Sequence, residues 1–272
     1  MDLGVAGGLV LAIAALLGAD LIDGGHLAAL LNPSAALLIV GGTIGATAVS
    51  CPLPDLLALP RLLLSALRPR AVNLPVEIER IVSLSLRARR NGLLSLEDDI
   101  AALDDPFLAH GLQMVIDGAD AETVRSVLRT DMLLRAQAGS RQAQVFETAG
   151  GFAPTMGIIG TVLGLIHVLS NLSSPGSLGP AIATAFLATF YGISSANIFW
   201  LPLGNKLRHN ARMESVAAEV ALEGILSIQA GDNPSAVRDK LSVFLQGPAP
   251  RPAAPEPEPA EEAPRGGSGR VA

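Results

Sequence analysis

Four long apolar stretches constrain this chain more than any other feature of its sequence. They run from Leu3 to Ile22, from Ser34 to Pro52, from Gly150 to Leu172 and from Leu178 to Leu203. The hydrocarbon core of a bilayer is roughly 30 Å thick, and a helix of about 20 apolar residues crosses it. The residues are 50% hydrophobic and 16% charged, which is typical of a membrane protein. The sequence therefore predicts an all-α membrane protein with four transmembrane helices.

All 19 Lys and Arg residues lie on one side of these four predicted spans. Eleven arginines, from Arg61 to Arg141, lie between the second and third spans, and the other eight basic residues follow the fourth. The short loops Asp23 to Pro33 and Ser173 to Ser177 contain no Lys or Arg. The positive-inside rule places the basic side in the cytoplasm. We therefore predict a multi-pass protein of the bacterial inner membrane with both termini cytoplasmic.

The order of the spans divides the chain into five parts. We predict transmembrane helices one and two at 1–52, a cytoplasmic helical domain at 53–149, and transmembrane helices three and four at 150–203. A cytoplasmic helix that completes the domain is predicted at 204–246, and a Pro/Ala/Glu-rich tail at 247–272. We predict that the tail is disordered, because it cannot bury enough apolar surface to offset the entropy of ordering.

Helical periodicity and turn residues predict the elements of the cytoplasmic part. In PVEIERIVSLSLRARR the apolar face is predicted to be Val76, Ile78, Ile81, Val82 and Leu86. The pair Asn91-Gly92 should end this helix. Ser95 is then predicted to cap the next helix, with Glu97, Asp98 and Asp99 in its first turn. A further amphipathic helix is predicted to begin near Asp120.

The third span has an unusual composition for a helix that only crosses lipid. From Gly150 to Val168 it contains no Asp, Glu, Lys or Arg, but five glycines, one proline and two threonines. Three of these glycines share one side of the helix: Gly157, Gly160 and Gly164. Small residues at such spacing let helices approach closely in lipid. Gly41 and Gly45 make a similar pair in the second span, and such faces pack either within the subunit or between subunits.

Polar side chains within the spans are few. The threonines are Thr155, Thr161, Thr184 and Thr189. Each hydroxyl can bond to a carbonyl of its own preceding turn, or several can form a polar wall on one surface. A cation carrier needs an ionisable or ligating group inside the membrane, and the spans offer only His167 and Asp20. If ions cross here, the titrating acid is predicted to come from another chain, whose helix the glycine and threonine face surrounds.

Two prolines lie near the cytoplasmic ends of the third and fourth spans. Pro154 is interpreted either as a helix-start proline or as a hinge between the span and the cytoplasmic domain. Pro202 is interpreted either as a helix stop or kink, or as a second hinge.

Four segments together resemble a known family: LNPSAALLIVGGTIGATAVSCPL, RRNGLLSLEDD, AGGFAPTMGIIGTVLGLI and LGPAIATAFLATFYGISSANIFWLPLGNKL. They are similar to the A subunits of the bacterial flagellar stator, of the MotA/PomA type, and the resemblance covers roughly residues 3 to 245. It implies a ring of five A subunits around two copies of a MotB/PomB-type B subunit, which has one span and binds peptidoglycan. It also implies that an aspartate of the B subunit carries H⁺ or Na⁺, with H⁺ favoured by base rates. The flow of ions then turns the ring, whose cytoplasmic domain engages the rotor protein FliG.

The resemblance also implies roles for individual residues. Thr161 and Thr189 match the threonines of the ion path, and we expect Thr155 to join them. Pro154 and Pro202 match the prolines linked to coupling. The pattern R-x-x-G-x-x-S-L-E aligns Arg89 and Glu97 with the charges that face the rotor, and Arg90 is the alternative arginine. The alternative interpretation of these charges is a purely structural one, in which they stabilise the ends of helices.

Other classes of function remain as alternatives. A TolQ/ExbB-type energiser of outer-membrane processes has three spans and an outside N-terminus, which four spans and the placement of basic residues argue against. A membrane scaffold that conducts no ions stays open. A secondary transporter is disfavoured, because the spans offer little to bind a substrate. The sequence has no metal-ligand spacing, nucleophile elbow or phosphate loop, so we expect no enzyme, catalytic residue, metal or cofactor. A net charge of −6 suggests no nucleic-acid partner.

Overall fold

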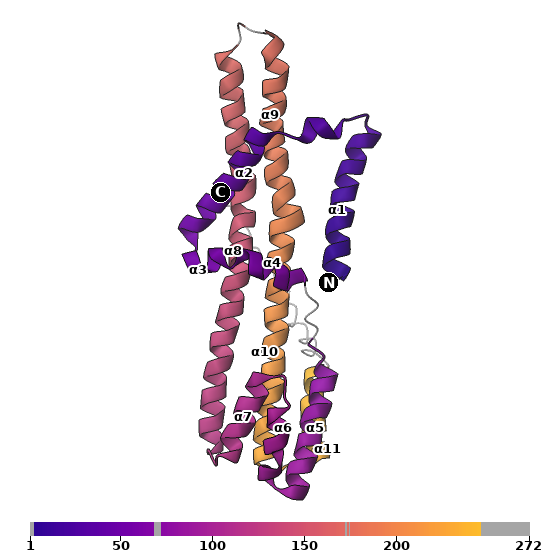
Figure 1. The fold of residues 1–272 in the computed structure, drawn as a ribbon, viewed down its shortest axis with the longest axis vertical. Coiled ribbons are helices and arrows are strands. Elements are labelled where there is room, and N and C mark those ends of the chain that lie inside the picture. The colour runs from indigo at the N-terminus through magenta and orange to yellow at the C-terminus, as the bar shows by residue number, and fades with distance from the viewer. Residues whose placement is uncertain (1–2, 68–71, 172, 174, 246–272) are drawn as a thin grey trace, which may run out of the picture.

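Two long helical rods that lie side by side form the axis of the molecule (Figure 1). The computed structural model describes residues 3–67, 72–171, 173 and 175–245. One rod is α8 (Ala121–Ser170), an unbroken helix of 50 residues. The other rod consists of α9 (Pro175–Ser194), the π-helical turn η3 (Ser195–Trp200) and α10 (Leu201–Gln229). The predicted tail at 247–272 lies outside the described residues.

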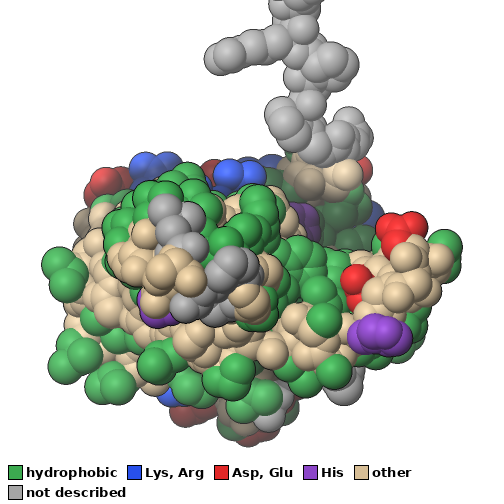
Figure 2. Space-filling view, turned by 90° about the horizontal axis from the view of Figure 1, so that it is seen from above, with side chains coloured by type: hydrophobic (Ala, Val, Ile, Leu, Met, Phe, Trp, Pro, Cys, Tyr) green, Lys and Arg blue, Asp and Glu red, His purple; other side chains and the backbone are tan. Residues whose placement is uncertain are grey.

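Among the residues that it describes, the structure confirms four helices that are long and apolar enough to cross a membrane: Leu3–Ile22, Pro33–Ser50, Ala121–Ser170 and Leu178–Gln229. Seen from the end where α8 meets α9, hydrophobic side chains cover much of the surface, and Lys and Arg lie farther from the viewer (Figure 2). The third and fourth spans are parts of longer helices that continue into the cytoplasmic part. The predicted boundaries between 149 and 150 and between 203 and 204 therefore fall inside continuous helices. Gly150 and Gly204 stand at these boundaries, but they serve close packing between the rods and do not end a helix.

The N-terminal helices lie beside the rods. They are α1 (Leu3–Ile22), η1 (Leu27–Leu30), α2 (Pro33–Ser50), α3 (Leu53–Leu57) and α4 (Leu59–Leu67). Asn32 caps α2 by accepting from the backbone N–H of Ala35 at 3.0 Å, and its side-chain amide donates to the Thr184 hydroxyl of α9 at 2.9 Å. The hydroxyl of Tyr191 donates to the carbonyl of Leu30. These bonds fix the link between α1 and α2 against the upper part of α9.

Short helices pack against the lower ends of both rods and form the cytoplasmic part (Figure 1). They are α5 (Leu74–Asn91), η2 (Leu93–Leu96), α6 (Glu97–Ala101), α7 (Pro106–Ile116), α11 (Pro234–Ser242) and η4 (Val243–Leu245). Their core includes Ile81, Leu108, Leu128 and Ile225, each at most 1% exposed. Burial of each such side chain stabilises the fold by about 1.5–3 kcal/mol.

The buried face of α5 is only partly the predicted one. Ile78, Ile81 and Val82 are buried, but Val76 is 52% exposed and Leu86 is 40% exposed. An α-helix turns by about 100° per residue, so Val76 and Leu86 each lie about 140° from Ile81. The predicted face was therefore too wide, and Leu74, Leu84, Ser85 and Ala88 complete the buried face instead.

Two of the three predicted helix boundaries are confirmed. Gly92, with a φ of 86°, ends α5, and a side chain would be strained in this conformation. Asp120 caps α8 by accepting from the backbone N–H groups of Glu122 and Thr123. The predicted cap at Ser95 is wrong, because Ser95 lies inside η2 and its hydroxyl donates to the carbonyl of Gly92 at 2.6 Å. The three acidic residues that begin at Glu97 do occupy the first turn of α6.

Candidate functional site

Small residues bring α8 and α9 into close contact within the membrane-spanning part. A Cβ atom added at Gly164 would lie 2.5 Å from Ala185 Cβ, and one at Gly160 would lie 2.4 Å from Ala188 Cβ. At Gly157 an added Cβ would lie 3.0 Å from the Cα atom of Thr189. We call this line of contact the α8 seam. The three glycines therefore pack within the chain, whereas an added Cβ at Gly41 or Gly45 of α2 would meet nothing within 4 Å.

Two threonine hydroxyls meet on the α8 seam. The hydroxyl of Thr161 on α8 contacts the hydroxyl of Thr189 on α9, and both side chains are partly buried. Thr161 also donates to the carbonyl of Gly157 at 3.1 Å or of Ala185 at 3.2 Å, and Thr189 lies 3.2 Å from the same Gly157 carbonyl. The result is a small cluster of hydroxyl and carbonyl oxygens between the third and fourth spans.

The other threonines of these spans lie elsewhere. Thr155 is exposed, and its hydroxyl donates to the carbonyl of Phe152 in its own helix at 2.7 Å. Thr184 donates to the carbonyl of Pro180 and accepts from Asn32. Thr155 is six residues from Thr161, which puts it about 120° around an ideal helix. The structure thus brings Thr161 and Thr189 together and leaves Thr155 on another face.

Neither proline ends a helix. Pro154 lies inside α8, so its interpretation as a helix-start residue is wrong. Pro202 is the second residue of α10, which continues to Gln229, so it is not a helix stop. The π-helical turn directly before Pro202 already interrupts the regular α-helical hydrogen bonds, and this lowers the cost of a residue without an N–H.

The ionisable groups of the spans lie away from this cluster. His167 is exposed, and its backbone carbonyl accepts from the side-chain amide of Asn171 at 2.8 Å. Asp20 lies at the end of α1, where one carboxylate oxygen is buried without a hydrogen-bond partner among the described residues. Within the described part of the chain, no carboxylate bonds to the hydroxyl of Thr161 or of Thr189.

The three charges predicted to face the rotor lie at the turn from α5 to α6. Arg89 and Arg90 occupy the last turn of α5 and Glu97 begins α6, and all three are exposed. In the described residues, none of them makes an ion pair or a side-chain hydrogen bond. Sequence reasoning missed the pair that does close this turn, Arg87 and Asp99. Their placement on opposite sides of Gly92 was the available signal.

A second ion pair joins the rods just below the spans, and no pattern in the sequence indicates it. Arg208 of α10 pairs with Glu147 of α8. The side chain of Glu147 is 27% exposed and that of Arg208 is 40% exposed. The rods also approach closely next to this pair, where a Cβ added at Gly204 would lie 3.1 Å from Glu147 Cγ.

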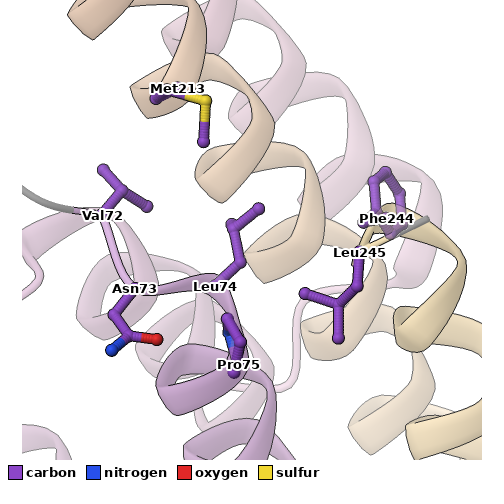
Figure 3. A pocket seen from close by; sticks show the side chains of 7 residues that line it. All are labelled: Val72, Asn73, Leu74, Pro75, Met213, Phe244 and Leu245. Atoms are coloured by element: carbon purple, nitrogen blue, oxygen red, sulfur yellow. The ribbon is translucent and has the colours of Figure 1, made fainter. Parts of the chain in front are cut away.

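A shallow groove lies far from both threonines, in the cytoplasmic part (Figure 3). Its volume is about 510 Å³. It lies between the start of α5, η4 and Met213 of α10, and its lining residues are Val72, Asn73, Leu74, Pro75, Met213, Phe244 and Leu245. The lining carries no titratable side chain, so the groove offers no chemistry for moving ions.

Comparison with known proteins identifies this architecture. Residues 99–220 match the model of the MotA/TolQ/ExbB proton channel family, and residues 6–85 match that of the motility protein A N-terminal region. Motility protein A of Bacillus subtilis is 36% identical over 242 residues, which cover 88% of each chain. The chemotaxis protein PomA of Vibrio alginolyticus is 30% identical over 243 residues, which cover 89% of this chain and 93% of that protein.

Solved structures agree with these sequence relatives. The structure of C. jejuni MotAB aligns with a TM-score of 0.86 and 29% identity, over 93% of this chain and 99% of that chain. The flagellar MotAB stator complex from Bacillus subtilis aligns with a TM-score of 0.82 and 35% identity, over 88% of this chain and 94% of that chain. The chain belongs to the MotA/TolQ/ExbB proton channel family. Within that family it is a membrane-embedded flagellar stator subunit of the motility protein A type, and the family is not one of enzymes.

Proposed function

We propose that this chain forms a pentameric ring around two copies of a MotB/PomB-type, peptidoglycan-binding subunit in the bacterial inner membrane. H⁺, or alternatively Na⁺, passes between the ring and the partner helices and turns the ring. The cytoplasmic part then drives the rotor protein FliG. The MotAB complexes among the related structures support a B-type partner, and the one-sided distribution of basic residues supports cytoplasmic termini.

The contact between Thr161 and Thr189 carries the assignment of the ion path. Their hydroxyls and the carbonyl of Gly157 place several oxygen atoms at one depth of the third and fourth spans. Oxygen ligands can replace part of the hydration shell of a cation or hold a water molecule. Since these spans provide no acid of their own at this cluster, the acid of the partner helix completes the path.

The first prediction tests this path through Thr189→Val, which keeps the shape of the side chain and removes its hydroxyl. We expect the complex to assemble and ion flux and swimming speed to fall by about tenfold, the effect of losing one hydrogen bond of about 1.4 kcal/mol. Ion flux is measured in vesicles that carry the complex with its B-type partner. Thr161→Val should act in the same direction.

Thr47→Val is the matched control. Thr47 is a buried threonine of α2 whose hydroxyl donates to the carbonyl of Thr43 in its own helix at 2.7 Å. We expect this variant to conduct normally. Normal flux and motility in Thr189→Val would assign Thr189 to packing alone and contradict the proposed path.

The second prediction tests whether Arg89 and Glu97 steer contact with the rotor. Both side chains are exposed and free of partners among the described residues, so they are available to opposite charges on FliG. We expect Arg89→Glu and Glu97→Lys to leave ion flux and assembly intact while swimming is strongly reduced. Complementary charge reversals on the rotor should restore swimming.

Capping of helix ends is the competing account, and it makes a different prediction. A charge at a helix end contributes about 0.3–1 kcal/mol of stability, which no rotor variant can repair. The assay therefore compares swimming in all reciprocal pairs at matched membrane levels of the protein. Failure of every pair at normal levels would favour capping.

A further inference from the structure

The α8 seam continues past the π-helical turn into the cytoplasmic part. Before the turn, a Cβ atom added at Gly192 would lie 2.5 Å from the carbonyl oxygen of Ala153. After it, the Cβ of Ala211 would lie 2.7 Å from a Cβ added at Gly139. Gly192 and Ala211 are 19 residues apart, yet both face α8.

An uninterrupted α-helix would not allow this alignment. Over 19 residues it turns by about 1,900°, so the second residue lies about 100° around the helix from the first. A π-helical turn holds one residue more than an α-helical turn and sets the following helix back by about 100°. The turn η3, at Ser195–Trp200, therefore returns α10 to the face that contacts α8.

The same arithmetic links the threonine cluster to the Glu147–Arg208 pair. Thr189 and Arg208 are also 19 residues apart on either side of η3, and both contact α8. On α8 their partners Thr161 and Glu147 are 14 residues apart, which puts them within about 40° of one another. One line of contact thus joins the two sites along both rods.

The surroundings make the ion pair suited to fix this alignment. Close contacts leave no room for a side chain at Gly204 or at Gly150, since a Cβ added at Gly150 would lie 2.6 Å from Leu201 Cδ2. Small residues alone permit α10 to rotate, because their contacts depend weakly on angle. A pair of opposite charges held by long side chains depends on which face of α10 is turned to α8.

We propose that Glu147 and Arg208 are positioning residues, which lock the rotation of α10 on α8 and thereby keep Thr189 against Thr161. The π-helical turn sets the rotation of α10 at which Arg208 faces α8, and the ion pair holds α10 at that rotation. This inference rests on the proposed function for the role of the threonines, but the lock itself is a property of this chain alone.

The test measures the alignment directly by disulfide formation. In a Cys51→Ser background, Thr161→Cys and Thr189→Cys place two thiols where the hydroxyls now touch, in the full chain assembled with its B-type partner in native membranes. We expect rapid cross-linking under mild oxidation. Adding Glu147→Gln or Arg208→Gln should reduce its initial rate by about threefold or more, the shift expected on losing a partly buried ion pair.

Two further variants separate a lock from general stability. The exchanged pair, Glu147→Arg with Arg208→Glu, should restore cross-linking. Glu79→Gln is the matched control, because it breaks the exposed pair between Glu79 and Arg238 and should change nothing. Unchanged cross-linking in both single variants at normal membrane levels, or no recovery in the exchanged pair, would overturn the proposal. Cross-linking does not depend on ion flow. A negative result here would therefore contradict the proposed lock, whereas normal flux in Thr189→Val would contradict the proposed ion path.

Discussion

At the scale of single residues, the glycines of the α8 seam determine how closely the helices pack, because they carry no side chain. The glycines on the α8 seam let the backbones of α8 and α9 approach until a methyl group no longer fits. The hydroxyls of Thr161 and Thr189 can meet across the helices only at this separation. Packing and the proposed ion path are therefore consequences of the same small residues.

The third prediction concerns Gly164→Ala. The added methyl would lie 2.9 Å from the Cα atom of Ala185, which is backbone and cannot turn aside. Forcing such a contact costs about 1–3 kcal/mol, which lowers the melting temperature by several degrees. Thermal unfolding of the purified complex measures it. Gly45→Ala, where nothing lies within 4 Å, is the control, and equal melting temperatures in the two variants would contradict the account.

The sequence predicted these glycines correctly as a close-packing face but could not say what they pack against. A small-residue pattern indicates near approach of any helix, and the partner is decided by the fold. The contact between Thr161 and Thr189 could not be predicted either, because these residues are 28 positions apart in sequence and their contact depends on the relative rotation of two helices. The position of Thr155, by contrast, follows from the sequence once α8 is known to be a regular helix. Its spacing of six residues from Thr161 then gives the angle between the two side chains around the helix axis.

At the scale of elements, helix ends and interruptions are where sequence and structure differ most. Asn91-Gly92 and Asp120 act locally, through backbone conformation and capping, and so they could be predicted. The π-helical turn could not be predicted, because neither a Gly nor a Pro lies within it. Ser95 was misassigned since a short 3₁₀ turn intervenes before α6, and nothing in the residue types distinguishes that turn from an extended cap.

The fourth prediction concerns the cap of α8. Hydrogen bonds from the backbone N–H and the hydroxyl of Thr123 hold the pKa of Asp120 below its ordinary value of 3.8. A lowered pKa in the folded state means that the cap stabilises the helix above the unfolded pKa. This stabilisation is lost as the pH falls through the folded pKa.

We therefore expect Asp120→Ala to lower the melting temperature of the cytoplasmic part at pH 7, with the difference from wild type shrinking below about pH 4. Circular dichroism of the purified chain across this range measures it. Asp120→Asn keeps an oxygen acceptor but cannot titrate, so its difference from wild type should narrow in the same window. A difference that stays constant with pH would rule out a contribution from the carboxylate.

At the scale of the whole molecule, the four spans set the topology. All basic residues of the chain lie in segments that the four candidate spans place on one side, and the positive-inside rule predicts that this side is cytoplasmic. The fold class was predictable because length and hydropathy alone decide it. The arrangement of α5, α6, α7 and α11 around the rods was not, since it depends on contacts between segments far apart in the chain.

The fifth prediction uses reporter fusions to test this topology. Alkaline phosphatase is active only in the periplasm, so we expect no activity when it follows Leu245. Insertion after Gly24, in the turn between α1 and η1, should give high activity. A reporter that works after Leu245 in a stably expressed fusion would overturn the cytoplasmic placement of the C-terminal part.

The unbroken length of α8 has a mechanical consequence. At 1.5 Å per residue its 50 residues extend about 75 Å, from the outer end of the third span to the base of the cytoplasmic part. An isolated helix of this length would twist and bend under load. Here a second rod lies along it. The contact between Thr161 and Thr189 and the ion pair between Glu147 and Arg208 resist sliding of one rod along the other. We expect the two rods to rotate as one stiff unit, so that an angular step of the spans is transmitted to the charges at the turn from α5 to α6.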